Sequence, residues 1–276
     1  MLKLTNIAIQ EGLTSLPGEK LLKWFLDRAN HTFVFFDTET TGLHRSLPDV
    51  DQITQISAIA CEMNMETLRF FEVGRFDRTI KLTQGLIDYM DREPEEPNKE
   101  EDPEGHKKWE HRSRKRILKM NHYDFANSDE REDETKALSD FDNFLNQYGK
   151  LTMIAHNAPF DLKWIQFHDI FANVNHEVID SMQFFKRFFF PILNNLSQDN
   201  IEYKKVYDKF PPSKPTEKTP NPGPSSALTS LATGFSNDAA ELEKKINTAH
   251  NSLVDCEIMM DVVEKGLLKI YHYLGR

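Results

Sequence analysis

The chain has 276 residues, of which 39% are hydrophobic and 28% are charged, and its formal net charge is −10 at pH 7. A chain of this length can bury a substantial core, as one domain or as one domain with additions. The net charge excludes a generally basic nucleic-acid coat, although it says little about a local site. No apolar stretch is long enough to predict a transmembrane helix, and the N-terminus lacks the apolar core of a signal peptide.

The cysteine content predicts the compartment. Cys61 and Cys256 are too few for a disulfide framework, and each lies in an apolar pattern typical of a small buried hydrophobe. We therefore expect a reducing, cytoplasmic setting without a membrane partner.

The first predicted elements are a helix and three strands. An amphipathic helix is predicted over residues 18–29, followed by a strand over residues 33–36 whose unbroken apolar run indicates burial on both faces. Residues 53–62 and 68–80 have the pattern of two further strands. Three strands in succession predict a meander.

A first insertion is predicted over residues 91–125. Its first part, to about residue 112, is charged and contains three prolines, so we expect a solvated loop. Residues 112–119 then carry five basic side chains and no acidic one, which predicts a helix with a basic face. We expect this helix to border the functional site and to contact the phosphates of a nucleic acid, through Arg114, Lys115 and Arg116 among others.

Helices and strands alternate after the first insertion. The apolar spacing predicts a helix over residues 134–148, a strand over 151–155, a helix over 161–168 and a short strand over 178–180. Asp180 is predicted to cap the next helix. The aromatic side chains of that helix are predicted to be core residues; they are Phe184, Phe185, Phe188, Phe189 and Phe190.

The last third of the chain contains a second predicted insertion over residues 198–226, where six prolines favour extended structure. A long helix is predicted to start near residue 252. We expect one domain over residues 1–276, with residues 1–31 as an N-terminal extension.

A chemically informative pattern follows the first buried strand, in the segment Asp37-Thr38-Glu39-Thr40-Thr41-Gly42-Leu43. Side chains alternate along a strand, so Asp37 and Glu39 point to the same side. Two adjacent carboxylates repel one another unless a cation lies between them, and a hard divalent ion with oxygen ligands fits this need. Taken alone, such a pair is more often a solvated strand end.

Two distant segments bear on this choice: residues 156–161, His-Asn-Ala-Pro-Phe-Asp, and residues 250–255, His-Asn-Ser-Leu-Val-Asp. Each has a structural interpretation by itself. Asp161 can be an acid of a helical first turn, favoured by the helix dipole. Asp255 can form a capping box with Ser252, and His250 can be a surface loop residue.

Together and in this order, the three segments resemble the DEDD superfamily of 3′→5′ exonucleases. The spacing of His250 and Asp255 is similar to that of the DEDDh subgroup, which includes polymerase proofreading exonuclease subunits and ribonuclease T. The resemblance implies a ribonuclease-H-like α/β fold, in which helices flank a mixed central sheet.

The resemblance also implies a catalytic site with two Mg²⁺ ions, for which Mn²⁺ can substitute. Asp37 would bridge the ions, Glu39 and Asp255 would complete one site, and Asp161 would join the cluster directly or through water. His250 would act as general base on the attacking water. The residues expected to receive the terminal nucleotide are Thr40, Thr41, Gly42, Leu43 and Asn157.

We therefore expect a metal-dependent enzyme that hydrolyses DNA, in single-stranded form, from its 3′ end and releases nucleoside 5′-monophosphates. An exoribonuclease remains an alternative, because no residue decides whether a 2′-hydroxyl is recognised. A catalytically silent nucleic-acid-binding or polymerase-docking module is a second alternative, although such a module is expected to have lost some of the five site residues. We expect a free-standing enzyme, because no recognisable polymerase-binding tail follows the last predicted helix; the oligomeric state is not predicted.

Overall fold

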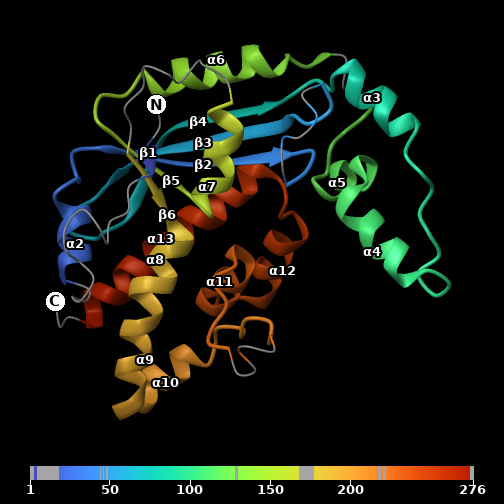
Figure 1. Ribbon diagram of the computed structural model, residues 1–276. Helices are drawn as coiled ribbons and strands as arrows, with labels where there is room; N and C mark the ends of the chain where they lie inside the picture. The colour runs from blue at the N-terminus through green and yellow to red at the C-terminus, as the bar shows by residue number, and fades with distance from the viewer. Residues whose placement is uncertain are drawn as a thin grey trace.

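The computed structural model of the protein describes residues 3–4, 19–43, 45, 47, 49–127, 130–167, 177–216, 219 and 222–273. Within these residues, six strands form one sheet in the order β1-β6-β5-β2-β3-β4 (Figure 1). The strands are β1 (Lys3–Leu4), β2 (Thr32–Thr40), β3 (Ile53–Met63), β4 (Phe70–Thr79), β5 (Leu151–Ala155) and β6 (Glu177–Asp180).

The pairing is mixed. Strands β2, β3 and β4 form the predicted antiparallel meander, whereas β5 runs parallel to both β2 and β6, and β6 runs parallel to β1. An antiparallel meander extended by parallel strands on the side of its first strand is the ribonuclease-H-like arrangement. The predicted fold class is thereby confirmed, with one short addition, β1, that the sequence pattern did not indicate.

Helices cover both faces of the sheet (Figure 1). The helices before β5 are α2 (Glu19–Leu26), α3 (Gln84–Asp91), α4 (Pro103–Arg112), α5 (Arg114–Met120) and α6 (Glu134–Leu145). Those after it are α7 (Ala158–Ile165), α8 (Ser181–Phe184), the π-helix η4 (Phe185–Phe189), α9 (Phe190–Asp199), α10 (Ile201–Tyr207), α11 (Leu228–Phe235), α12 (Ala239–Asn247) and α13 (Ser252–Tyr273).

Alternation along β2 divides the core into two layers. Phe33 and Phe35 pack against α2, α13 and the aromatic cluster around η4, whereas Val34 and Phe36 pack against α6 and α7. All five phenylalanines of residues 184–190 are buried, so their predicted core role is confirmed. Asp37 and Glu39 continue the first series, and they therefore project on the α13 side of the sheet.

The carboxyl end of β2 lies beside an open position in the sheet. The parallel pairing with β5 runs from Thr32 to Phe35, and β5 ends at Ala155. The rest of β2 is paired with β3 alone, and the register shifts between Glu39 and Thr40. Functional groups beyond the end of a strand are accessible at such a gap, which is where open α/β sheets place their sites.

Two local predictions are wrong. Helix α4 occupies the second half of the segment predicted to be a solvated loop, because Pro103 is compatible with a first helical turn and the side chain of Asp102 accepts from the backbone N–H of Gly105. Helix α10 occupies part of the second insertion, where Asn200 accepts from the N–H of Glu202 and the prolines begin only afterwards. The described helices include none that is long and apolar enough to cross a membrane.

Candidate metal centre and active-site cleft

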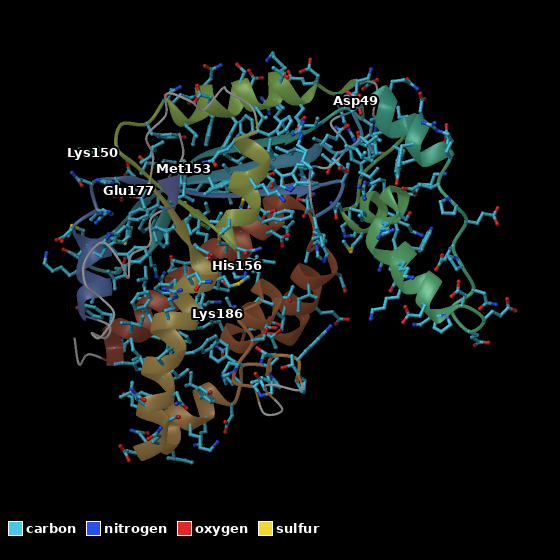
Figure 2. All side chains as sticks on the ribbon, in the orientation of Figure 1. Asp49, Lys150, Met153, His156, Glu177 and Lys186 are labelled. Atoms are coloured by element: carbon cyan, nitrogen blue, oxygen red, sulfur yellow. The ribbon has the colours of Figure 1, made fainter. Side chains whose placement is uncertain are left out.

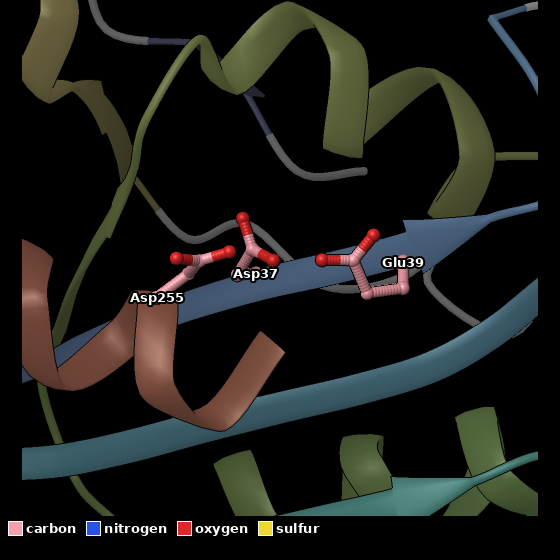
Figure 3. A group of neighbouring side chains, drawn as sticks. All are labelled: Asp37, Glu39 and Asp255. Carbon is pink, nitrogen blue, oxygen red and sulfur yellow. The ribbon is translucent and has the colours of Figure 1, made fainter. Parts of the chain in front are cut away.

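Three carboxylates from two elements meet at the end of β2. Oxygen atoms of Asp37, Glu39 and Asp255 lie within 4.8 Å of one another. Figure 3 shows the three groups side by side, with that of Asp37 between the other two. Asp37 and Glu39 come from one face of β2, and Asp255 comes from the first turn of α13.

The first turn of α13 is held on the sheet by β3. The hydroxyl groups of Ser57 and Ser252 are 2.5 Å apart, and the backbone N–H of Ser252 donates to the side-chain oxygen of Gln55 at 3.2 Å. The side chain of Asn251 accepts from the N–H of Val254 at 3.3 Å, so Asn251 caps the helix. The alternative in which Ser252 forms the capping box is therefore wrong, because its hydroxyl group is engaged by β3.

Asp161 reaches the same place from the opposite layer. It lies in the first turn of α7 and is 1% exposed. One of its carboxylate oxygens accepts from the N–H of Thr38 at 3.0 Å and from the hydroxyl of Thr38 at 2.8 Å. The Thr38 N–H points toward the side where β5 has ended, so Asp161 takes the place of the missing strand partner. Asp161 is outside the group of three mutually close ligand atoms.

The electrostatics of the cluster are unfavourable without a cation. Burial, followed by the charges of Asp161, Glu39 and Asp255, raises the pKa of Asp37 well above its ordinary range. Burial and the neighbouring acids raise the pKa of Glu39 in the same way, and burial raises the pKa of Asp255 to about 6. Carboxylates at this separation remain ionised together only when positive charge compensates them. An all-oxygen donor set suits a hard divalent ion such as Mg²⁺, so the residues present fit the predicted metal.

The carboxylates lie in a cleft with a volume of about 470 Å³. This is within the usual size of pockets for small organic ligands. The described residues that line it are Asp37, Thr38, Glu39, Thr40, Gly42, Leu43, Glu110, Arg116, Ile117, Met120, Asn121, His156, Phe160, Asp161, His250 and Asp255. All five residues predicted to be catalytic are among them.

His250 lines this cleft and lies two residues before α13. Its φ angle of 66° is in the left-handed region, and its backbone N–H donates to the Asp255 carboxylate at 3.1 Å. Partial burial lowers the pKa of the imidazole, and the nearby His122 lowers this pKa further. The side chain is therefore neutral near neutral pH and can accept a proton.

Comparisons with known proteins give a structural likeness only. No family model matches the chain, and no curated protein matches it. Solved structures of Escherichia coli exonuclease I do match. The complex with a dT13 oligonucleotide has a TM-score of 0.45 and 14% identity, and the match covers 85% of this chain and 40% of that one. A product-bound structure has a TM-score of 0.44 and 15% identity, with coverages of 88% and 46%.

A third exonuclease I structure, whose description concerns processivity, has a TM-score of 0.47 and 15% identity, with coverages of 88% and 43%. The chain thus spans less than half the length of the exonuclease I chains that it matches.

The residues expected to receive a nucleotide fall into two groups. Thr40, Gly42 and Leu43 line the cleft, and Leu43 is 66% exposed. The buried hydroxyl of Thr41 instead accepts from the N–H of Gln52 at 3.0 Å, which is a contact within the protein. Asn157 does not line the cleft either; its φ angle is 62°, and its N–H donates to Asp180. That contact joins the turn before α7 to the cap of α8.

His156 is a cleft residue that the sequence analysis did not assign. It follows β5, and its Nδ1 atom lies 2.9 Å from the hydroxyl of Ser181. Burial lowers its pKa to about 4, and the charge of Lys186 on η4 contributes (Figure 2). His156 is therefore a neutral residue at physiological pH. Its place in the same short segment as Asp161 is the sequence signal that could have identified it.

The other unassigned lining residues belong to the first insertion: Glu110, Arg116, Ile117, Met120 and Asn121. They come from α4, α5 and the residue after α5. The expectation that the basic segment borders the site is thus met by Arg116. Arg114, which was also expected to contact phosphates, is not among the lining residues. Its guanidinium is buried and bonded to Asp51 at 2.6 Å.

Proposed function

We propose that the protein is a metal-dependent 3′→5′ exonuclease of the DEDDh type, which removes nucleoside 5′-monophosphates from the 3′ end of single-stranded DNA. The observation that carries the proposal is the cluster of Asp37, Glu39 and Asp255 in a cleft that also contains Asp161 and His250. Four buried or half-buried carboxylates and a histidine that lines the same cleft together match the chemical needs of phosphodiester hydrolysis.

Asp37, Glu39 and Asp255 would hold the divalent metal. When bound, the metal would neutralise charge on the scissile phosphate and stabilise the attacking and leaving oxygens. Asp161 contributes negative charge beside Asp37 and fixes the end of β2 through Thr38. The position of Asp37 therefore depends on Asp161, even if Asp161 contacts the metal only through water.

His250 would accept a proton from the attacking water. The Asp255 carboxylate accepts from the backbone N–H of His250, which fixes the backbone there without using a ring nitrogen. The neutral form needed by a general base is favoured by the lowered pKa. His156, which is also neutral and lies deeper in the cleft, would orient the substrate without carrying charge.

The terminal nucleotide would lie between β2 and the first insertion. Leu43 presents an exposed apolar side chain on one side, and Met120, 41% exposed, presents another on α5. Both can contact the flat face of a base without reading its identity. A site of this kind suits an enzyme that removes one nucleotide after another from any sequence.

The test incubates the protein and Mg²⁺ with 5′-labelled single-stranded DNA or with RNA of the same sequence. The products are resolved on a denaturing gel. A ladder shortened from the 3′ end, with mononucleotide product, is expected for DNA. His250→Ala should slow this degradation strongly. His272→Ala, which changes an exposed histidine of α13, serves as a matched control. Degradation of RNA alone would reassign the substrate, and internal cleavage or no cleavage with either polymer would refute the proposal.

A further inference from the structure

The hairpin of α4 and α5 is rigidly attached beside the cleft. Arg114 donates to the fully buried Asp51 at 2.6 and 3.1 Å. The carboxylate of Glu93 accepts from the Ser113 hydroxyl at 2.9 Å and from the Arg114 N–H at 2.5 Å, which holds the start of α5. Leu118 is fully buried beside α3. The hairpin therefore presents fixed side chains to the cleft.

Two contacts lock this hairpin to the end of β2 itself. A Cβ atom on Gly42 would lie 3.3 Å from a guanidinium nitrogen of Arg114, so the absence of a side chain at Gly42 lets the hairpin approach closely. The side-chain amide of Asn121 donates to the backbone carbonyl of Thr40 at 3.2 Å. These contacts place α5 beside the end of β2, so that its side chains can line the cleft.

Arg116 is a basic side chain of α5 that lines the cleft. Among the described residues that line the cleft, it is the one lysine or arginine, against five acidic residues. Its guanidinium donates to the backbone carbonyl of Glu110 at 2.8 Å and to the Glu110 carboxylate at 3.2 Å. Both side chains are 36% exposed, and the two contacts use two of the five guanidinium N–H donors.

The ion pair between Arg116 and Glu110 is suited to an exchange of one anion for another. An ion pair at such exposure contributes little to stability, so a second anion can take the place of the carboxylate at low cost. A phosphate offers a planar guanidinium two parallel hydrogen bonds. The contact with the Glu110 backbone carbonyl keeps Arg116 in position during the exchange.

We propose that Arg116 binds a backbone phosphate upstream of the scissile bond, and that the Glu110 carboxylate occupies Arg116 until the strand arrives. This proposal rests on the proposed function, since it concerns the same cleft. Its consequence is selection for length: a strand with a second phosphate gains the contact, whereas a single nucleotide ester does not. An acidic cleft thereby obtains affinity for a polyanion without a generally basic surface.

The test measures binding of 5′-fluorescein-labelled oligothymidylate by anisotropy, with Ca²⁺ as the metal, over a range of salt concentrations. Arg116→Ala is expected to raise Kd about tenfold, in the range of a charge-assisted hydrogen bond, and to reduce the salt slope by about 0.7. Glu110→Gln is expected to tighten binding. Arg112→Ala, which removes an exposed arginine of the same hairpin outside this cleft, is the matched control and should change Kd by less than about twofold.

Hydrolysis of thymidine 5′-(p-nitrophenyl phosphate) with Mg²⁺ gives the second readout, and Arg116→Ala should slow it less than it slows hydrolysis of the oligonucleotide. An unchanged salt slope in Arg116→Ala, or an equal loss of affinity in Arg112→Ala, would overturn the proposal. Weaker binding by Glu110→Gln would overturn the exchange. If the native protein hydrolyses neither substrate, the proposed function fails, but Kd and salt slope still decide the role of Arg116.

Discussion

Asp161→Asn separates the two roles that the structure gives to this side chain. The amide keeps an oxygen that can accept from the N–H and hydroxyl of Thr38, and it removes the negative charge beside Asp37. We expect the variant to lose nuclease activity and to gain stability in the absence of divalent metal. The gain should depend on pH.

The magnitude follows from the pKa of Asp161. Burial raises it from 3.8 to about 7 against the opposing hydrogen bonds from Thr38. The folded state therefore retains a proton that the unfolded chain has released, so stability falls as pH rises between these two values. At about 1.4 kcal/mol per pKa unit, Asp161 alone should cost the metal-free protein about 2 to 3 kcal/mol between about pH 5 and about pH 8.

The assay is urea unfolding in chelator at these two pH values, followed by tryptophan fluorescence. The native protein should lose stability as pH rises, and Asp161→Asn should lose about 2 to 3 kcal/mol less. Asp208→Asn, which changes the exposed acid at the C-cap of α10, should behave like the native protein. An identical pH dependence in the native protein and Asp161→Asn would refute the electrostatic reasoning. Asp161→Ala should instead be destabilised by about 2 to 4 kcal/mol, since both Thr38 donors lose their buried partner.

Three further predictions concern other parts of the site and its support. Asp37→Ala should abolish turnover and weaken Mn²⁺ binding in calorimetry; retention of both would exclude Asp37 as a ligand. His250→Ala should reduce single-turnover rates by about 10²–10⁴ and leave Mn²⁺ binding intact; an unchanged rate would exclude the histidine as general base. Arg114→Ala should lower the free energy of unfolding by about 3 to 5 kcal/mol, because the buried Asp51 carboxylate loses its guanidinium partner, whereas Lys115→Ala should be neutral; equal stabilities would contradict the buried pair.

Apart from β1, the described strands could be predicted from local pattern, and so could helices such as α2, α6 and α13. The apolar runs before Asp37 and His156 identify buried strands, and their polar ends identify the edge of the sheet where function is expected. The convergence of Asp37, Glu39, Asp161 and Asp255 could be expected only because three spaced segments together resembled one family. Spacing alone cannot bring distant elements together, and the roles of these residues stay predictions.

Other features could not be predicted, because they depend on tertiary partners. The basic segment of α5 looked uniform in sequence, yet Arg114 is buried on Asp51 whereas Arg116 faces the cleft. The hydroxyl of Thr41 looked available to a nucleotide, yet the backbone of Gln52 engages it. In each case a residue of a different element decides the role of a side chain whose local pattern is ambiguous.

The attachment of α13 to β3 also has a consequence for the order of assembly. The hydroxyl pair Ser57–Ser252 joins positions 195 residues apart in the chain, and it sets Asp255 beside Asp37. Contacts between such distant positions form late in folding, because the intervening chain must first be ordered. During synthesis, the sheet and Asp37 emerge long before the first turn of α13. A partly made chain therefore lacks the complete carboxylate cluster, and the proposed nuclease activity would arise only when α13 docks.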